Sequence, residues 1–467
     1  MAAVVSAKTE AIPVVHIVKG EILKGTDIRY EGAGGAGFVT PRVDLGKLVW
    51  PRTEPGPAFD TKLSEILDLL VATGEALRRD EHGVLAEAAE QMRLSSGYDA
   101  GIVTRSYHVL PELFSRDRML SLIEGEIGNG ELLDGWVPFK NRIGGRGALR
   151  AFPPRLIHVL AGNAPGVAAL SIIRGAITKG VHLLKLPSND LFTSVAILRA
   201  LATVAPGHPV ARSFSAVYWR GGDASVESAI FRPQYFDKLV AWGGESAIRS
   251  AKNYIGPGFE LVAFDPKTSI SMIGKEALAS PEWIADSAER AAIDSTSYNQ
   301  AACIASRFHY VEAKNEDAVD QYCAELQKRM GVERRTCSVF GPKVSTELRE
   351  EIETLKSFGS LYRVFGDYDG KGLVIRSDEP LDIYPDGKIV NVVRVPNLAQ
   401  AIRYATVATQ TVGVYPPERK AELRNALASA GVQRVVTLGG AEGMVAGMSH
   451  DGFFPLHRMV RWVNDEG

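Results

Sequence analysis

The residue with the greatest capacity for chemistry is Cys303, in the stretch DSTSYNQAACIASRFHYV that covers residues 294–311. A thiolate is a strong nucleophile, and the small side chains of Ala301, Ala302 and Ala305 leave room for a substrate to approach it. The competing interpretation is a cysteine packed in the core, because free cysteine is among the most buried residue types. This segment alone favours burial, so the rest of the chain must decide.

A second candidate is Asn163, in the stretch LAGNAPG that follows the apolar run LIHV. The pattern indicates a strand, a short loop and a helix that begins near Pro165. An amide NH₂ at the carboxyl end of a strand can donate to a developing oxyanion. The same asparagine could instead cap the helix or stabilise the turn, and the local sequence does not separate these roles.

Two more junctions between a strand and a helix suit a dinucleotide. In VHLLKLPSND, Lys185 ends a strand and Ser188 and Asn189 precede a helix, a position that suits a ribose or phosphate. The alternative is a solvated lysine, with Asp190 as the helix N-cap. In AWGGESAIRSA, a glycine pair allows close approach of a ligand to the backbone, and the residues concerned are Gly243, Gly244 and Glu245.

A literal G-x-G-x-x-G match, GAGGAG, occupies residues 32–37. A dinucleotide fingerprint needs a helix directly after the glycines, so that its first amides meet the pyrophosphate. Here Pro41 and a strand-like run follow. We therefore expect a glycine-rich turn and not the cofactor loop.

The composition is that of an average globular enzyme. A chain of 467 residues is expected to form about two or three domains. The formal charge of -2, with 45% apolar and 23% charged residues, gives no reason to expect nucleic acid or an anionic membrane as a partner. The uncharged run at 156–173 contains His, Asn and Pro, and is better read as strand, loop and helix than as a membrane span.

Cysteine usage and the first residues indicate a cytoplasmic protein. Cys303, Cys323 and Cys337 are an odd number of cysteines without a CxxC pair, which argues against a disulfide framework or a zinc site. Lys8 and Glu10 are followed by no unbroken apolar segment, which argues against a secretory signal.

Strand-like and helical patterns alternate from residue 155 onward. We predict strands at 156–161, 181–187, 214–219, 238–242 and 259–264, with helices near 166–179, 190–204, 223–230 and 245–253. This alternation predicts a parallel, doubly wound sheet that binds ligands at the carboxyl ends of its strands. We divide the chain into a β-rich segment, a Rossmann-like cofactor domain, a catalytic α/β domain and a closing segment, at residues 1–57, 58–268, 269–440 and 441–467.

In chain order these stretches resemble the aldehyde dehydrogenase superfamily, and more closely its LuxC-like acyl-CoA reductase branch, the fatty acid reductases of bioluminescence and their relatives. The matching stretches are LAGNAPG, LLKLPSND, AWGGESAIRSAK, GPGFEL, YNQAACIASRF, VPNLAQAIRYATVATQTVGVY and HDGFFPLHRMVRWV. The match covers roughly residues 100–467, and its strength lies in this collinear order. It implies an α/β fold of two doubly wound domains with a small β-rich oligomerisation element.

The resemblance also assigns catalytic roles. It implies that Cys303 is the nucleophile and that Asn163 donates to the oxyanion. Glu260, in GPGFEL, is implied either as a base or as a neighbour of the nicotinamide, because Leu-Val-Ala replaces the usual Leu-Gly-Gly after it. His450 is a candidate to line the acyl pocket or polarise the thiol, with a turn-stabilising role as the alternative. His309 is better interpreted as a structural strand residue.

The implied cofactor is a nicotinamide dinucleotide. Lys185, Ser188 and Asn189 match the adenosine-ribose site, and the Gly243 pair with Glu245 matches the pyrophosphate turn. NAD-selective relatives often carry a glutamate where this chain has neutral Asn189, so NADPH is favoured over NADH.

The implied reaction is the reduction of an acyl thioester, on coenzyme A or an acyl carrier, to the aldehyde through a Cys303 acyl-enzyme. An acyl-transferring protein is an expected partner. The alternatives are a hydrolytic aldehyde dehydrogenase that uses Glu260 to activate water, an acyl-phosphate reductase, and a binding protein that has lost activity. A homo-oligomer is expected, with residues 1–57 or 125–151 supplying a strand.

Overall fold

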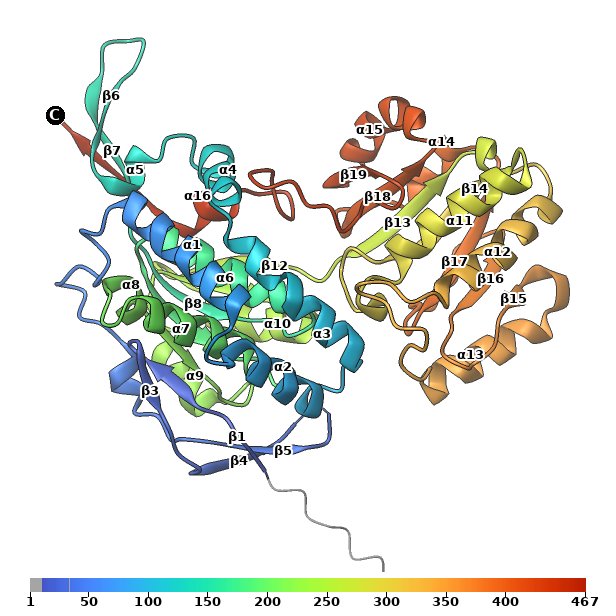
Figure 1. Cartoon of the computed structure of the whole chain (residues 1–467). Helices are drawn as coiled ribbons and strands as arrows, with labels where there is room; N and C mark the ends of the chain where they lie inside the picture. The colour runs from blue at the N-terminus through green and yellow to red at the C-terminus, as the bar shows by residue number, and fades with distance from the viewer. Residues whose placement is uncertain (1–10, 33) are drawn as a thin grey trace, which may run out of the picture. The chain divides into compact units, whose positions relative to one another are not determined.

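The computed structural model describes residues 11–32 and 34–467 and divides into two compact units (Figure 1). Unit 1 extends to Asp265 and includes Ala446–Gly467, whereas unit 2 is Pro266–Val445. The boundaries thus differ by a few residues from those drawn on the sequence at 268 and 440. Lys8 and Glu10, on which the argument against a secretory signal rests, lie outside the described residues.

Unit 1 contains a seven-stranded sheet in the order β12-β11-β8-β9-β10-β2-β3. Its five parallel strands match the predicted ones, and they are β8 (Arg155–Val159), β9 (Val181–Lys185), β10 (Phe214–Val217), β11 (Lys238–Trp242) and β12 (Glu260–Phe264). The N-terminal segment adds β2 (His16–Val18), antiparallel to β10, and β3 (Glu21–Leu23), antiparallel to β2 at the edge of the sheet. Part of the segment at 1–57 is therefore integral to the cofactor sheet.

Helices cover both faces of this sheet, as a doubly wound fold requires. Alternate strand residues point to opposite faces, so Leu184 joins the core beneath one helical layer and Leu183 the core beneath the other. The first layer contains α1 (Leu63–Arg79), α6 (Pro165–Ile177) and α7 (Thr193–Val204), flanked by α2 (Val84–Ser95), α3 (Ala100–Val109) and α4 (Arg116–Glu126). The second contains α9 (Ala224–Ile230) and α10 (Glu245–Lys252).

Two small sheets complete unit 1. The closing segment contributes α16 (Pro455–Met459) and β20 (Arg461–Glu466), and β20 pairs with β7 (Arg146–Phe152), which pairs with β6 (Val137–Lys140). The other sheet joins β1 (Ile12–Pro13), β5 (Gly37–Thr40) and β4 (Ile28–Glu31). Of the GAGGAG motif, Gly32 and residues 34–36 lie between β4 and β5, and Gly37 begins β5. The amide of Gly34 donates to the carbonyl of Ser95 at 2.8 Å, and a Cβ there would lie 2.7 Å from that oxygen.

Unit 2 has its own seven-stranded sheet, in the order β15-β16-β17-β14-β13-β18-β19, in which β15 alone is antiparallel (Figure 1). Its strands are β13 (Thr268–Ile273), β14 (Ser306–Glu312), β15 (Arg363–Phe365), β16 (Leu373–Ser377), β17 (Ile389–Val395), β18 (Thr409–Tyr415) and β19 (Arg434–Thr437). One face packs on α11 (Pro281–Ser295) and α12 (Glu316–Met330), and the other on α14 (Leu398–Ala401) and α15 (Lys420–Ser429). Helix α13 (Thr346–Ser357) packs at the β15–β16 side.

Candidate functional site

The predicted cofactor residues of unit 1 lie at one edge of its sheet, where β8 to β12 end; we call it the carboxyl edge. Val159, the last residue of β8, is opposite Lys185, the last residue of β9. Asn163 follows β8 in the loop to α6, and Gly243 follows β11, the other neighbour of β8. Parallel pairing therefore brings together three positions that are far apart in the sequence.

The loops that carry Asn163 and Asn189 pack against each other. A Cβ on Gly162 would lie 2.2 Å from Oδ1 of Asn189, so only glycine permits this approach. Nδ2 of Asn189 donates to the hydroxyl of Tyr98 at 2.7 Å. The side chain of Asn189 is thus engaged within the protein, and the half-buried Ser188 is its neighbour in this loop.

Lys185 is buried to 9% exposure, with Nζ 5.5 Å from the ring centre of Tyr218. Burial lowers the pKa of Lys185 to about 8, against the opposing influence of Glu227. That carboxylate is itself buried and accepts hydrogen bonds from Trp219 Nε1 and the amide of Gly222. Lys185 is therefore a largely protonated cation at neutral pH, held in a fixed place at the carboxyl edge.

The glycine pair precedes α10, and Gly244 is the N-cap of that helix. No described atom lies within 4 Å of the place where a Cβ on Gly244 would stand. An open backbone at the start of a helix suits an anionic group. Glu245, predicted as part of the same turn, forms an ion pair with Arg249 along the exposed face of α10.

His450 lies at the same edge. Its ring packs edge-on against Trp242 and Phe264, with centroids 5.4 and 5.1 Å away. These two rings stack on each other at 3.5 Å, and they are the last residues of β11 and β12. The structure thus brings His450 together with the strand ends from which the cofactor residues come.

Glu260 is not brought to this edge. It is the first residue of β12, opposite Lys238 at the start of β11, and four residues before Phe264, or about 13 Å along the strand. Lys238 Nζ and Arg458 Nη2 lie 3.0 and 2.8 Å from its carboxylate oxygens. Burial raises the pKa of Glu260, but these two cations outweigh it and the net pKa is lowered.

The interpretation of Glu260 as a base or a neighbour of the nicotinamide therefore needs correction, because the structure separates it from Asn163 and Lys185. The Leu-Val-Ala that follows Glu260 continues β12, so the carboxyl end of this strand comes several residues later. The exposed carboxylate that directly follows that end is Asp265.

In unit 2, Cys303 is exposed, whereas Cys323 and Cys337 are buried. It lies in the short loop between a 3₁₀ turn (Ser297–Gln300) and β14. Ser269 Oγ donates to the carbonyl of Cys303 at 2.8 Å, and Gln410 Nε2 donates to its sulfur at 3.4 Å. The core interpretation, which the segment alone favoured, is therefore wrong.

The turn before Cys303 is strained and firmly braced. Tyr298, Asn299 and Gln300 have φ angles of 52°, 51° and 74°, a left-handed conformation that costs a residue other than glycine about 1–3 kcal/mol. The side-chain amide of Asn299 donates to Ser338 Oγ at 2.7 Å and accepts from the backbone N–H of Ser338 at 3.0 Å. The side-chain amide of Gln300 donates to the carbonyl of Ile389 at 2.7 Å and accepts from the backbone N–H of Ile389 at 3.0 Å. Such strain, maintained by surrounding contacts, is typical of a preorganised functional loop.

Residues 58–462 match the family described as acyl-CoA reductase (LuxC). The chain belongs to this family. Two similar curated proteins are the long-chain acyl-protein thioester reductases of Photorhabdus luminescens and Vibrio harveyi, 29% and 26% identical over 413 and 412 residues. Each alignment covers 87% of this chain and 83% of the relative.

The fold of this chain is similar to those of solved dehydrogenase structures. The NAD-dependent benzaldehyde dehydrogenase of Corynebacterium glutamicum superposes with a TM-score of 0.71 over 100% of both chains at 13% identity. The NADP-dependent glyceraldehyde-3-phosphate dehydrogenase of Bacillus halodurans gives 0.68 over 97% of this chain and 98% of that one, at 14% identity. The predicted aldehyde dehydrogenase fold is confirmed, and membership of the LuxC family makes this protein an acyl reductase.

His309 is structural in this LuxC family member. It is fully buried, with its ring nitrogens 2.8 Å from Ser295 Oγ and 3.0 Å from the hydroxyl of Tyr322. Burial lowers the pKa of His309 to about 3, so the ring is neutral. It supplies no proton near Cys303.

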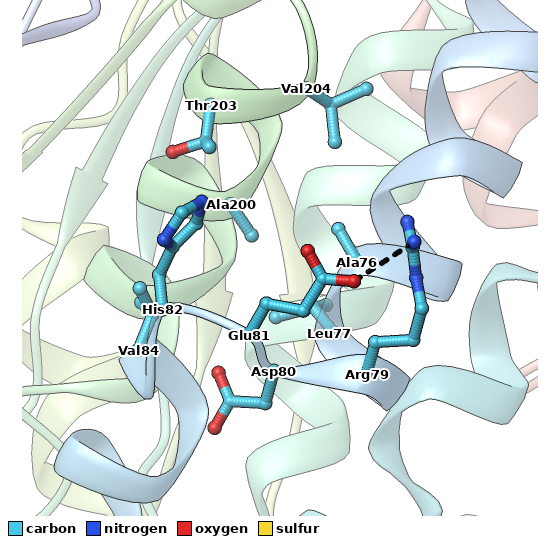
Figure 2. Close-up of a pocket in the computed structure, with 10 residues that line it drawn as sticks. All are labelled: Ala76, Leu77, Arg79, Asp80, Glu81, His82, Val84, Ala200, Thr203 and Val204. Atoms are coloured by element: carbon cyan, nitrogen blue, oxygen red, sulfur yellow. Dashed lines mark hydrogen bonds and ion pairs between the residues drawn. The ribbon is translucent and has the colours of Figure 1, made fainter.

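A surface pocket of about 190 Å³ lies between the end of α1 and the end of α7 (Figure 2). Helix α7 begins at the carboxyl edge and returns along the sheet, so Thr203 and the pocket belong to the opposite end of the layer. The carboxylate of Asp80 accepts from the amides of Leu85 and Ala86, and Glu81 pairs with Arg79. We assign this pocket no part in the chemistry.

Proposed function

We propose that the protein reduces an acyl thioester to the aldehyde through an acyl-enzyme on Cys303, with NADPH as the reductant. The observation that carries the proposal is the exposed sulfur on a strained, braced loop beside an amide donor. The names of the relatives favour a long-chain acyl group borne on a protein thiol, delivered by an acyl-transferring partner. Acyl-coenzyme A carries the same reactive group.

In the proposed reaction the Cys303 thiolate attacks the thioester carbonyl carbon, and its backbone N–H stabilises the oxyanion. The carrier thiolate leaves, and the acyl group remains on Cys303. A bound nicotinamide dinucleotide supplies hydride to that acyl carbon. Collapse of the hemithioacetal then releases the aldehyde and restores the Cys303 thiolate. A second oxyanion donor, Asn163, remains a prediction from the family resemblance, and His450 is a further candidate for contact with the acyl group.

The carboxyl edge of unit 1 fits the proposed dinucleotide. The buried Lys185 would bind the adenosine ribose or its phosphate beside Ser188, and the backbone at Gly243 and Gly244 would face the pyrophosphate. A second cation, the exposed Arg220, follows β10 next to the strand that ends in Lys185. Two cations and a neutral Asn189 favour NADPH over NADH.

Arg220→Gln is expected to raise the KM for NADPH about tenfold and to leave the KM for NADH unchanged, because the 2′-phosphate loses a charged partner. Steady-state kinetics with both cofactors check this. Arg212→Gln is the matched control, since Arg212 is also exposed but precedes β10. Equal effects on the two cofactors would refute the assignment of Arg220.

The acyl-enzyme is tested by intact mass spectrometry after incubation with tetradecanoyl-CoA in the absence of nicotinamide. One added acyl group is expected in the natural protein, mapped by peptide analysis to Cys303 and not to Cys323 or Cys337. Cys303→Ala should show no addition. A folded natural protein that stays unmodified, yet oxidises free aldehyde with NAD⁺ to the acid, would establish the hydrolytic alternative.

A further inference from the structure

The sulfur of Cys303 lies beside an irregular part of the unit 2 sheet. Around Ser269 in β13 both neighbouring strands carry an extra residue: Ser306 and Phe308 pair with consecutive residues of β13, and Gln410 and Thr411 together oppose Ser269. Such bulges re-aim side chains and are common next to active sites. Here Gln410 donates to the Cys303 sulfur at 3.4 Å.

Arg434 holds a positive charge on the strand next to the one that carries Gln410. Arg434, the first residue of β19, is paired in register with Thr411. Its guanidinium donates to the carbonyls of Ala441 and Gly443 at 2.7 and 3.1 Å, and lies 3.4 Å from the hydroxyl of Thr411. Three contacts to the protein hold the charge in one place, so it needs no reorganisation when the sulfur becomes negative.

The charge of Arg434 acts on Cys303. Burial lowers the pKa of Arg434, while Asp294 and Cys303 both raise it. An interaction of this kind is mutual, so the guanidinium favours the thiolate. Asp294 of α11 faces the same cation and accepts from the amides of Gly439 and Ala441, at 2.8 and 2.9 Å.

Two further charged residues, Glu442 and Arg307, contact the turn before Cys303. Glu442, in the loop after β19, raises the pKa of Asp294 and accepts from Ser297 Oγ at 2.9 Å and Arg335 Nη2 at 2.6 Å. On β14, Arg307 donates to the carbonyl of Gln300 at 2.7 Å. The histidine of this unit that lies nearest in sequence, His309, is buried and bonded elsewhere.

We propose that Gln410 and Arg434 form a thiolate-stabilising site, in which Gln410 is the catalytic donor that touches the sulfur and Arg434 is a positioning residue that supplies fixed positive charge. The inference builds on the proposed role of Cys303 as nucleophile. It assigns stabilisation of the Cys303 thiolate to an amide and a guanidinium. Neither residue was singled out by the sequence analysis, because both contacts depend on sheet register.

The test measures the rate of alkylation of Cys303 by iodoacetamide against pH, with peptide mass spectrometry to separate it from buried Cys323 and Cys337. Only the thiolate reacts, so the midpoint of the profile reports ionisation. In the natural protein we expect a midpoint below the ordinary value of about 8.5. Gln410→Leu and Arg434→Met should each raise it by about one unit, which is about a tenfold slower reaction at pH 7.

Three further variants separate charge from structure. Gln410→Glu should raise the midpoint more than Gln410→Leu, because it adds a like charge. Arg434→Lys should keep most of the natural value. Arg424→Gln, an exposed arginine of α15, should leave the profile unchanged. Circular dichroism shows whether Arg434→Met folds. If it does not, the midpoints of Gln410→Leu, Gln410→Glu and Arg434→Lys test the proposal.

Midpoints in folded Gln410→Leu, Gln410→Glu and Arg434 variants that all equal the natural value would overturn the proposal. The assay contains neither acyl-CoA nor nicotinamide, so its outcome is independent of the acyl-enzyme experiment. Shifted midpoints without acylation would support the thiolate-stabilising site and refute the proposed reaction. Acylation with unshifted midpoints would support the proposed reaction and refute the thiolate-stabilising site.

Discussion

Replacement of Cys303 by alanine is expected to reduce the rate of acyl-CoA reduction by at least about 10⁴-fold, the scale seen when an enzyme loses its nucleophile. Without the sulfur no covalent thioester forms, and the remaining groups can only bind the reactants. The thermal unfolding midpoint should change little, because Cys303 is exposed and contributes little to the core. Steady-state formation of aldehyde checks the rate, and calorimetry checks the fold.

A matched measurement separates chemistry from cofactor binding. The proposed cofactor groups belong to unit 1, so a fluorescence titration with NADPH should give the same affinity for the natural protein and Cys303→Ala. Residual activity within about tenfold of the natural rate would show that another group is the nucleophile. Cys323 and Cys337 are poor replacements, since both are buried.

Glu126→Leu is expected to destabilise unit 1 by about 3–5 kcal/mol, because it leaves a buried cation without its partner. Arg174 Nη2 lies 3.3 Å from Glu126 Oε1, with side-chain exposures of 4% and 0%. Nε and Nη1 of Arg174 have no hydrogen-bond partner among the residues that the structure describes. Glu126 Oε2 also accepts from the amide of Leu456 at 2.5 Å, so the variant should loosen α16 as well.

Thermal unfolding and limited proteolysis of the closing segment measure this loss. The double variant Glu126→Leu with Arg174→Met is the control, because it removes both charges and leaves apolar groups of similar size. It should recover most of the lost stability, as buried ion pairs exchanged for apolar pairs often do. A double variant as unstable as Glu126→Leu would show that packing, not the unpaired charge, sets the cost.

Local patterns accounted for most of the fold. Short apolar runs and helical periodicity placed β8 to β12 and the helices between them within a few residues. A buried parallel strand is written as a short apolar run, and a half-buried helix imposes its period on the sequence. The expected strand after GAGGAG is confirmed, since β5 begins at Gly37. Within the described residues, no helix is long and apolar enough to span a membrane.

Asn163, Lys185 and Gly243 were placed correctly at one edge because parallel strands bring their ends together whatever their exact register. Glu260 was not, since its position depends on where β12 ends, and Leu-Val-Ala extends that strand. His450 could be placed only by its packing on Trp242 and Phe264, which are about two hundred residues earlier in the chain.

The sequence by itself determined the family, the two doubly wound sheets and the candidate nucleophile, because these depend on periodicity and on the order of short motifs. The tertiary structure decided what surrounds each group: the exposure of Cys303, the braced left-handed turn before it, and the approach of Gln410 and Arg434. Those features arise from strand register, bulges and contacts between distant segments, which are non-local and leave no periodic signal in the chain.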